Sequence, residues 1–292
     1  MPIEPDAPRP RCGQPIAAVV VSYRPDLAAF SDALTVLAGE EPRLKVIGVA
    51  NGCDPADPRS SLMQPRVTIL ARAENLGFAG GANLGVGRAF AGGASVVVIL
   101  NDDVEADSAS VVRLGDEATP VRAIGATTTA DIDSDAFAGG AIDWRHGFGY
   151  HASGRLDYLT GAALAIHRAT WERVGPFDAS LFLYYEDVDW SLRARARGVE
   201  LAVSPITVHH RGGASSGGTR GPTWAYYHTR NRIRFLRNYR GRFAALRAWC
   251  WTFAWTLGYL RDRRRVLIPA HLRALRDAAF GRHGRGPYPR RP

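Results

Sequence analysis

The chain has 292 residues, of which 46% are hydrophobic and 22% charged, proportions that are typical of a folded globular protein and exclude wholesale disorder. Its three cysteines (Cys12, Cys53 and Cys250) form no Cys-x-x-Cys pair, which excludes a disulfide scaffold and a structural zinc site. The net charge of +9 is uneven: residues 220–292 carry +16 and residues 1–219 carry −7, so the C-terminal quarter favours an anionic partner such as nucleic acid or an anionic membrane surface.

Residues 1–15 are rich in proline and arginine and lack the apolar core of a signal peptide, so we expect a flexible tail and a cytoplasmic location. Apolar, β-branched runs follow at 16–22, 44–50, 67–71 and 95–100. Segments with helical spacing of apolar residues lie between them, at 27–37 and around 83–91. This alternation predicts an α/β fold whose mostly parallel sheet is covered by helices on both faces.

The pattern becomes irregular after about residue 130 and is rich in glycine and aromatic residues at 137–154. Order returns with an apolar run at 158–166, a helix from Thr170 and a second helix after Tyr185. Polar segments follow the first four strands, at 22–25, 51–54, 74–75 and 101–103. Because parallel sheets bind ligands at the carboxyl ends of their strands, we expect these four segments to form one binding edge.

Asp102 and Asp103 directly follow a buried strand and repel each other unless a cation or hydrogen-bond donors compensate. Mg²⁺ or Mn²⁺ prefers one or two such carboxylates together with the oxygens of a diphosphate. The same residues are also typical of a turn that caps the next helix, since Asp107 and Ser108 are good cap residues. Both interpretations stay open at this point.

A glycine-rich segment at 74–85 joins a strand to a helix, where the backbone can approach a ligand and a helix N-terminus can offer N–H groups to an anion. It matches neither the Walker loop nor the Gly-x-Gly-x-x-Gly spacing of dinucleotide-binding folds. The alternative is a tight turn without a ligand.

Glu186, Asp187 and Asp189 begin a helix after an aromatic run. Capping and the helix dipole account for one or two of these carboxylates, and the third favours a general base at a pocket wall. His209 and His210 end a further strand and precede a Gly-Gly pair, which suits either a solvated structural role or a metal ligand beside a closing loop.

Taken in order, these segments resemble the family 2 glycosyltransferases with a GT-A fold, and among them the rhamnosyltransferase-like enzymes of bacterial cell-surface polysaccharide assembly. The matching pieces are residues 19–25, 75–85, 100–104, 160–164, 174–178, 185–190 and 210–215. Two positions depart from the family pattern. Asn101 stands in place of the first Asp of the metal motif, and Ala50 stands where relatives often carry an Asp beside the nucleobase.

The resemblance implies a GT-A domain over residues 16–220, with a donor half at 16–105 and an acceptor half at 106–220. Asp187, paired with Glu186, corresponds to the catalytic base, and Asp103 and His210 correspond to the metal ligands, with His209 the weaker choice. The donor nucleotide is expected at Ser22, Arg24, Asn51, Asp54, Asn75, Gly77 and Asp102. The sugar pocket is expected at Thr160, Gly161, Asp189 and Trp190.

The implied reaction is an inverting transfer, dependent on Mg²⁺ or Mn²⁺, from a nucleoside diphosphate sugar. The resemblance favours L-rhamnose from dTDP-rhamnose, with another sugar from a UDP donor as the alternative. The implied acceptor is a saccharide or a polyprenyl-linked saccharide.

Residues 221–292 are predicted to form a basic, helical extension, with one helix at 224–236 and an uncharged run of 13 residues at 248–260. Crossing a bilayer as a helix takes about 20 residues, so this run is too short. Its tryptophans and the arginines at 261–265 suit the surface of an anionic membrane, so we expect peripheral attachment to the inner face of the cell membrane. An ordinary core helix with a solvated basic face is the alternative.

The sequence disfavours three rival functions. A sugar nucleotidyltransferase needs a basic Gly-x-Gly-x-Arg loop after the first strand, which this chain lacks. A nucleic-acid-binding module would use the arginine-rich end, but the acidic first three quarters oppose a polyanion, so we expect no nucleic-acid partner. The intact 101–103 and Glu186–Asp187 segments argue against a silent scaffold.

Overall fold

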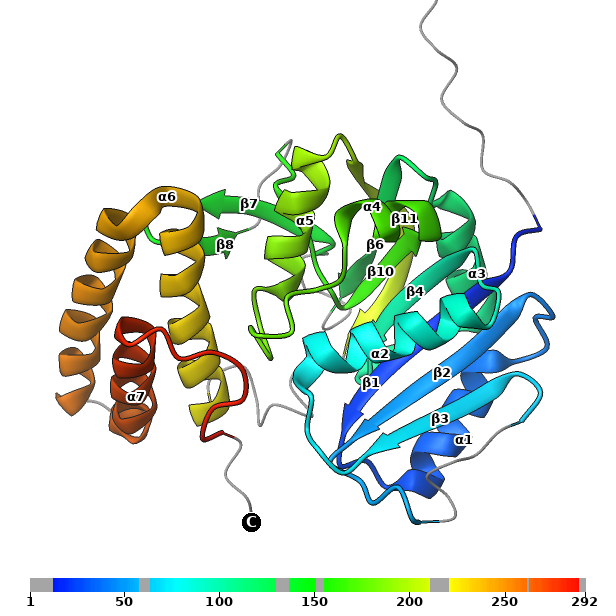
Figure 1. Ribbon diagram of the computed structural model, residues 1–292, viewed down its shortest axis with the longest axis horizontal. Helices are drawn as coiled ribbons and strands as arrows, with labels where there is room; N and C mark the ends of the chain where they lie inside the picture. The colour runs from blue at the N-terminus through cyan, green and yellow to red at the C-terminus, as the bar shows by residue number, and fades with distance from the viewer. Residues whose placement is uncertain are drawn as a thin grey trace, which may run out of the picture.

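The computed structural model describes residues 13–57, 64–129, 137–150, 155–210, 221–261 and 263–288. At its centre lies an eight-stranded sheet with the strand order β3-β2-β1-β4-β10-β6-β11-β5 (Figure 1). Its strands are β1 (Ile16–Tyr23), β2 (Leu44–Asn51), β3 (Val67–Arg72), β4 (Val96–Asn101), β5 (Val104–Glu105), β6 (Arg122–Thr129), β10 (Ala163–His167) and β11 (Glu200–His210).

Strands β3, β2, β1 and β4 run parallel to one another, as their alternation with helices predicts. β10 is antiparallel to both of its neighbours, β4 and β6, while β11 runs parallel to β6. The predicted α/β fold with a mostly parallel sheet is therefore confirmed. The parallel order also brings the ends of β1, β2 and β4 to the same edge of the sheet.

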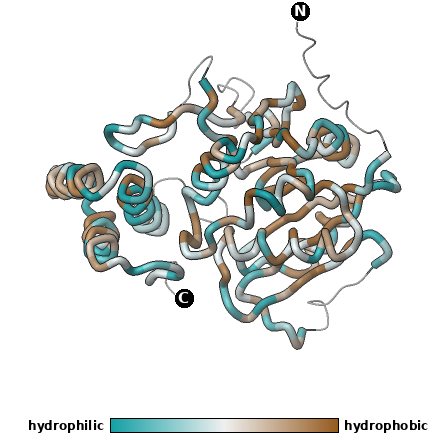
Figure 2. The backbone as a smooth tube through the Cα atoms, turned by 45° about the horizontal axis from the view of Figure 1, so that its top comes forward, coloured by the Kyte–Doolittle hydropathy of each residue, from teal (hydrophilic) through white to brown (hydrophobic). Residues whose placement is uncertain are grey.

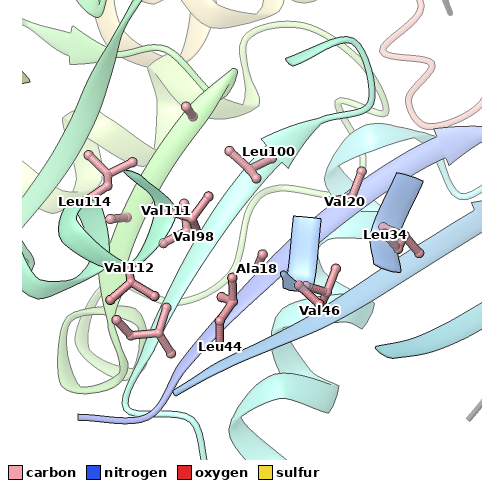
Figure 3. Close-up of a cluster of buried hydrophobic side chains, with 14 of the residues drawn as sticks. Ala18, Val20, Leu34, Leu44, Val46, Val98, Leu100, Val111, Val112 and Leu114 are labelled. Carbon is pink, nitrogen blue, oxygen red and sulfur yellow. The ribbon is translucent and has the colours of Figure 1, made fainter. Parts of the chain in front are cut away.

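Helices cover both faces of this sheet. One face packs on α1 (Leu27–Ala38) and α3 (Ser108–Glu117), where Leu34 and Val111 lie among apolar strand residues such as Val98 (Figure 3). The other face packs on α2 (Gly77–Ala91), α4 (Arg168–Val174) and α5 (Glu186–Ala196). Because each central strand contributes buried side chains to both clusters, the strands are nearly continuous apolar runs.

The glycine-rich segment is largely helical, and not the loop that we predicted. α2 begins at Gly77, well before the expected start near Asn83. Gly85 of α2 packs directly against β1, so that a Cβ added to it would stand 2.3 Å from a methyl carbon of Val19. The absence of a side chain therefore allows the helix to pack closely on the strand, and this contact outweighs the low helix propensity of glycine.

A second, three-stranded sheet has the order β8-β7-β9 and comprises β7 (Gly139–Asp143), β8 (Phe148–Tyr150) and β9 (Tyr158–Leu159). The single ordered run predicted at 158–166 is in fact divided between two sheets, because β9 belongs to this small sheet and β10 to the large one. The chain between them, at 160–162, connects the two sheets: Thr160 N donates to the Ala138 carbonyl at 2.9 Å, and the Ala162 carbonyl accepts from Asn101 N at 3.0 Å.

The C-terminal segment folds into packed helices beside the small sheet (Figures 1 and 2). α6 (Pro222–Gly258) is interrupted at Gly241, whose φ of 83° and ψ of 176° are not helical, and α7 (Ile268–Ala279) packs against it. Trp144 of the β7–β8 connection stacks on Phe235 of α6 with ring centroids 5.5 Å apart. Among the described residues, no helix combines the length and the apolar character that crossing a membrane requires.

Candidate active site

A cavity of about 580 Å³ lies at the edge of the large sheet, between the ends of β1, β2 and β4 and the start of α5. It brings together most of the predicted site residues, which come from segments far apart in the sequence. Those that line it are Ser22, Asn51, Asn75, Gly77, Asp102, Asp103, Thr160, Gly161, Glu186, Asp187 and His210.

One wall of the cavity carries acidic and imidazole groups. The Ser22 hydroxyl donates to Asp102 Oδ2 at 2.5 Å, and His210 Nε2 lies 3.0 Å from Asp103 Oδ1. β11 pairs with β5 so that His210 stands opposite Val104, next to the Asp103 carboxylate. Because side chains alternate along a strand, this register brings His210 to the cavity and turns His209 to the other face.

This wall has the donor chemistry of a divalent cation site. The Asp103 side chain is only 7% exposed, and its carboxylate and the His210 imidazole supply the oxygen and nitrogen that Mn²⁺ accepts, while Mg²⁺ prefers the oxygens. Within the described part of the chain, no three His, Cys, Asp or Glu side chains gather closely enough to hold a metal by themselves. A cation here would therefore need ligands from a bound molecule as well.

Asn51 and Asn75 tie the start of α2 to the sheet. Asn51 is 2% exposed, and its Nδ2 donates to the Gly77 carbonyl at 3.1 Å while its Oδ1 accepts from Leu76 N at 3.4 Å. Asn75 Oδ1 accepts from Gly77 N at 2.9 Å. Leu76 N and Gly77 N are therefore bonded within the protein, while the expectation that the N-terminus of α2 offers N–H groups to an anion stays a prediction.

On the α5 side of the cavity lie two adjacent carboxyl groups in different environments. Asp187 accepts two backbone hydrogen bonds, from Gly161 N at 2.9 Å and from Val188 N at 2.8 Å. Glu186 is 6% exposed, and its Oε2 is buried without a hydrogen bond from any described residue. The N–H groups around Asp187 favour a charged carboxylate there, whereas nothing comparable stabilises a charge on Glu186 Oε2.

Burial, and to a lesser extent the neighbouring Asp187 charge, together raise the pKa of Glu186 to about 8. Burial also raises the pKa of Asp187, while its backbone hydrogen bonds oppose that shift. We infer that at neutral pH the pair holds one proton, that the proton resides on Glu186, and that Asp187 is the ionised member. An ionised, partly buried carboxylate in a cavity can accept a proton from a bound hydroxyl.

The turn that precedes α5 has an unusual backbone. Phe182, Tyr184 and Tyr185 have φ angles of 69°, 67° and 74°, in the left-handed region that bulky residues avoid. Each such residue costs about 1–3 kcal/mol and persists only where its surroundings hold it. The turn ends at Glu186, so its shape determines where the two carboxyl groups lie.

Sequence reasoning missed the aromatic wall of the cavity. His228 of α6 stacks on Trp224 with ring centroids 4.6 Å apart and lies 5.2 Å from the Tyr185 ring. Burial lowers the pKa of His228 to about 3, so its ring is neutral. The aromatic runs at 182–185 and 224–228 were visible in the sequence, but nothing in it showed that they meet. The aromatic lining comprises Phe78, Phe137, Tyr158, Phe182, Tyr184, Tyr185 and His228, together with Tyr23 at the end of β1.

Two residues predicted to line the sugar pocket point elsewhere. Trp190 is fully buried in the core under the sheet, and its Nε1 donates to the Gly175 carbonyl at 3.0 Å. Asp189 accepts from Arg193 Nε at 2.8 Å and from the Tyr239 hydroxyl at 2.8 Å, outside the cavity lining. We therefore correct both assignments: one residue packs the core and the other joins α5 to α6.

Two predicted donor-binding residues are exposed and also lie outside the lining. The Asp54 carboxylate accepts from Ala56 N at 2.9 Å and so closes a local turn. The Arg24 guanidinium lies over the Tyr23 ring, 5.7 Å from its centroid. Neither residue lines the cavity in this structure, so both donor-binding assignments stay predictions. The Arg-Gly-Gly-Ala-Ser segment at 211–215 and the tail at 1–12 lie outside the described residues.

No family model matches the chain. The solved structure of a mannosyltransferase from Pyrobaculum calidifontis, in complex with GDP-Man and Mn²⁺, superposes with a TM-score of 0.53 at 14% identity, over 96% of this chain and 79% of that one. This likeness establishes the fold, an α/β architecture like that of the GT-A glycosyltransferases, followed by a C-terminal helical segment.

Curated sequences add distant relatives. An N-acetylglucosaminyl-diphospho-decaprenol L-rhamnosyltransferase of Mycobacterium tuberculosis is 26% identical over 92% of this chain and 98% of its own length. An uncharacterized protein of the same organism is 33% identical over 144 residues, 48% of this chain, and the match spans only about half (55%) of that relative. The fold and the distant relative together support sugar transfer.

Proposed function

We propose that the chain is an inverting, metal-dependent glycosyltransferase that moves a sugar from a nucleoside diphosphate to a saccharide or lipid-linked saccharide. The observation that carries the proposal is a single cavity that holds both the Asp102–Asp103–His210 wall and the Asp187 carboxyl group. An acidic wall for a cation-bound diphosphate and a separate base for a hydroxyl are what this reaction requires.

In this proposal Asp187 accepts the proton of the acceptor hydroxyl as its oxygen forms a bond to the anomeric carbon. The bond between that carbon and the diphosphate breaks on the opposite side, so the configuration inverts. Asp103 and His210 would hold Mg²⁺ or Mn²⁺, which when bound stabilises the negative charge of the leaving diphosphate. Ser22 orients Asp102 through its 2.5 Å hydrogen bond, and Asp102 is suited to contact the donor ribose.

For the donor we propose L-rhamnose on dTDP, with a UDP-linked sugar as the second candidate. The resemblance of the sequence motifs and the M. tuberculosis rhamnosyltransferase relative support rhamnose. The same relative, which bears a decaprenol acceptor in its name, supports a polyprenyl-linked saccharide as acceptor.

The test is a panel of nucleotide sugars, including dTDP-rhamnose, UDP-sugars and GDP-mannose, with Mg²⁺, with Mn²⁺ and with a chelator. We expect one donor to raise the melting temperature in the presence of the metal and to be hydrolysed slowly without an acceptor. If no donor changes either quantity while the protein is folded, the proposal fails. Salt-sensitive binding to oligonucleotides instead would favour the rival nucleic-acid function.

The Asp187→Asn substitution tests the proposed base. Asparagine preserves the size of the side chain but cannot accept the proton, so we expect kcat to fall by about 10²- to 10⁴-fold. Donor binding, measured by calorimetry, is expected to stay as in the wild type because the acidic wall is unchanged. Near-normal turnover in the variant would remove Asp187 from this role.

The C-terminal helices also support attachment to the inner, cytoplasmic face of the cell membrane, which we propose as the site of action. Exposed residues of the second half of α6 recur at intervals of three and four: Phe243, Leu246, Cys250, Phe253 and Leu257. Exposed arginines follow at Arg261 and at 263–265. An apolar stripe that ends in a basic cluster suits an anionic lipid surface.

A second copy of the chain fits this stripe poorly. In the described part of residues 221–288 the one acidic residue is Asp277, which is 3% exposed. Two such faces would therefore bring basic clusters together without opposing charge. The charge also fits nucleic acid less well than its total suggests, because Arg230 and Arg232 are buried.

A further inference from the structure

The strained turn at 181–185 is held from outside by α6. Asn231 is fully buried, and its Nδ2 lies within hydrogen-bond distance of three carbonyl oxygens of the turn: 2.9 Å from Leu181, 2.8 Å from Leu183 and 2.9 Å from Tyr184. These carbonyls converge on one amide nitrogen only because the backbone between them is folded back in the left-handed region. The amide therefore stabilises this turn conformation in particular.

Arg230 fixes the orientation of that amide. Its Nε donates to Asn231 Oδ1 at 3.0 Å, which forces the Asn231 Nδ2 group to face the turn. Its Nη2 donates to the same Leu181 carbonyl at 3.0 Å, and its Nη1 donates to the Gly284 carbonyl at 2.7 Å. Arg230 is 2% exposed, so its charge is compensated by these buried oxygens and by the faces of two tyrosine rings.

Further contacts from α6 bracket the turn on both sides. Before it, Arg234 pairs with the Asp178 carboxylate at 2.7 Å. After it, the Tyr239 hydroxyl donates to Asp189 Oδ1 at 2.8 Å, one helical residue beyond Val188. The first half of α6 thus contacts the segment leading into α5, the turn itself and α5, all within residues 178–189.

We propose that Arg230 and Asn231 form a positioning pair that sets the location of Asp187 through the 181–185 turn. The inference rests on the proposed function of Asp187. Neither residue lines the cavity, so neither is a catalytic residue. Consequently the C-terminal helices are a working part of the catalytic unit, in addition to any contact that they make with a membrane.

The test compares Asn231→Ala with Asn238→Ala, which makes the same chemical change at an exposed position two turns further along the same helix. We expect Asn231→Ala to lower kcat about 10- to 100-fold, because small displacements of a reacting group are costly. Donor binding by calorimetry is expected to keep the wild-type stoichiometry and affinity, which shows that the molecules counted are folded. Asn238→Ala is expected to behave as the wild type.

Hydrogen exchange measured by mass spectrometry reports the local stability of the turn independently of enzymatic activity. In Asn231→Ala we expect faster exchange in peptides covering 181–190 and unchanged exchange in peptides covering β1. Unchanged exchange at 181–190, or faster exchange with a wild-type kcat, overturns the positioning role. If the wild type transfers no sugar from any donor, the proposed function fails, while the exchange data still decide whether the pair holds the turn.

Arg230→Lys, which keeps the charge but loses the fork of donors, is the second variant and is expected to give the same pattern more weakly.

Discussion

Glu186 is the residue whose chemistry is most altered by its place in the fold. It begins α5 beside Asp187, is almost completely buried, and has one carboxylate oxygen without a hydrogen bond from the described residues. We infer that Glu186 serves the site by remaining neutral, because a second full charge would destabilise the ionised form of Asp187. A buried acid that stays protonated at neutral pH must cost stability as the pH rises.

The Glu186→Gln substitution tests this cost. The pKa is raised from 4.5 to about 8 by burial and by the Asp187 charge, so the folded protein keeps a proton that the unfolded chain releases between these values. Stability of the wild type therefore falls as the pH rises through this window, by at most about 1.4 kcal/mol per pH unit from this group. Glutamine mimics the protonated acid and removes that dependence.

We expect the melting temperature of Glu186→Gln to approach that of the wild type near pH 5 and to exceed it increasingly up to pH 8. Thermal unfolding of both proteins across this range is the measurement. A difference that does not vary with pH would mean that Glu186 is ionised in the folded protein. A difference of opposite slope would mean that a neighbouring cation stabilises the charge.

The residues of α5 also show how much of the candidate site could be predicted from the sequence. The sequence pattern places Glu186, Asp187 and Asp189 at a helix start, and the cavity does contain the first two. Which side of the helix faces the cavity depends on its rotation, which is set by the left-handed turn at 182–185 and by its contacts with α6. No local pattern encodes these contacts, so Trp190 was assigned to the pocket although it packs the core.

At the scale of the element, α2 is where tertiary packing overrides propensity. Its glycines suggested a ligand-binding loop, yet they form a helix because close contact with β1 is available only without side chains. The strands, by contrast, were predictable because each is buried on both faces and hence apolar throughout. The strands could be predicted because burial on both faces requires apolar residues along their whole length. The start of α2 could not, because it depends on packing against one neighbouring strand, β1.

Two glycines of α2 allow a matched test of this explanation. In Gly85→Ala the new Cβ would meet the Val19 methyl carbon at 2.3 Å, so we expect a loss of about 1–3 kcal/mol from overpacking. In Gly87→Ala, two residues along the same helix, no atom beyond the neighbouring backbone of the helix itself lies within 4 Å of the new Cβ, and we expect a gain of about 0.5–1 kcal/mol from helix propensity. Urea unfolding of the two variants measures both values. Equal effects would contradict the packing explanation.

At the scale of the whole molecule, the two halves of α6, before and after Gly241, have different roles. The half of α6 before this glycine holds the turn in front of Asp187, and its arginines are largely buried or paired inward. The half after it lies furthest from the large sheet in Figure 1 and carries the exposed apolar stripe. The sequence predicted the charge of this segment and its helices, but not that part of the charge serves the protein interior.

The proposed membrane contact is tested with the triple variant Leu246→Ser, Phe253→Ser and Leu257→Ser. Each removes an exposed apolar side chain from the stripe, and a buried Leu or Phe contributes about 1.5–3 kcal/mol, so we expect binding to anionic vesicles to fall by more than about tenfold. The matched control replaces Val36, Val121 and Val203, exposed valines of the sheet unit, by serine. Co-sedimentation with phosphatidylglycerol vesicles at low and high salt is the measurement, with transfer to a soluble acceptor as the check on folding. Vesicle binding that survives the stripe variant, or that the valine control reduces equally, would place any membrane contact on another surface.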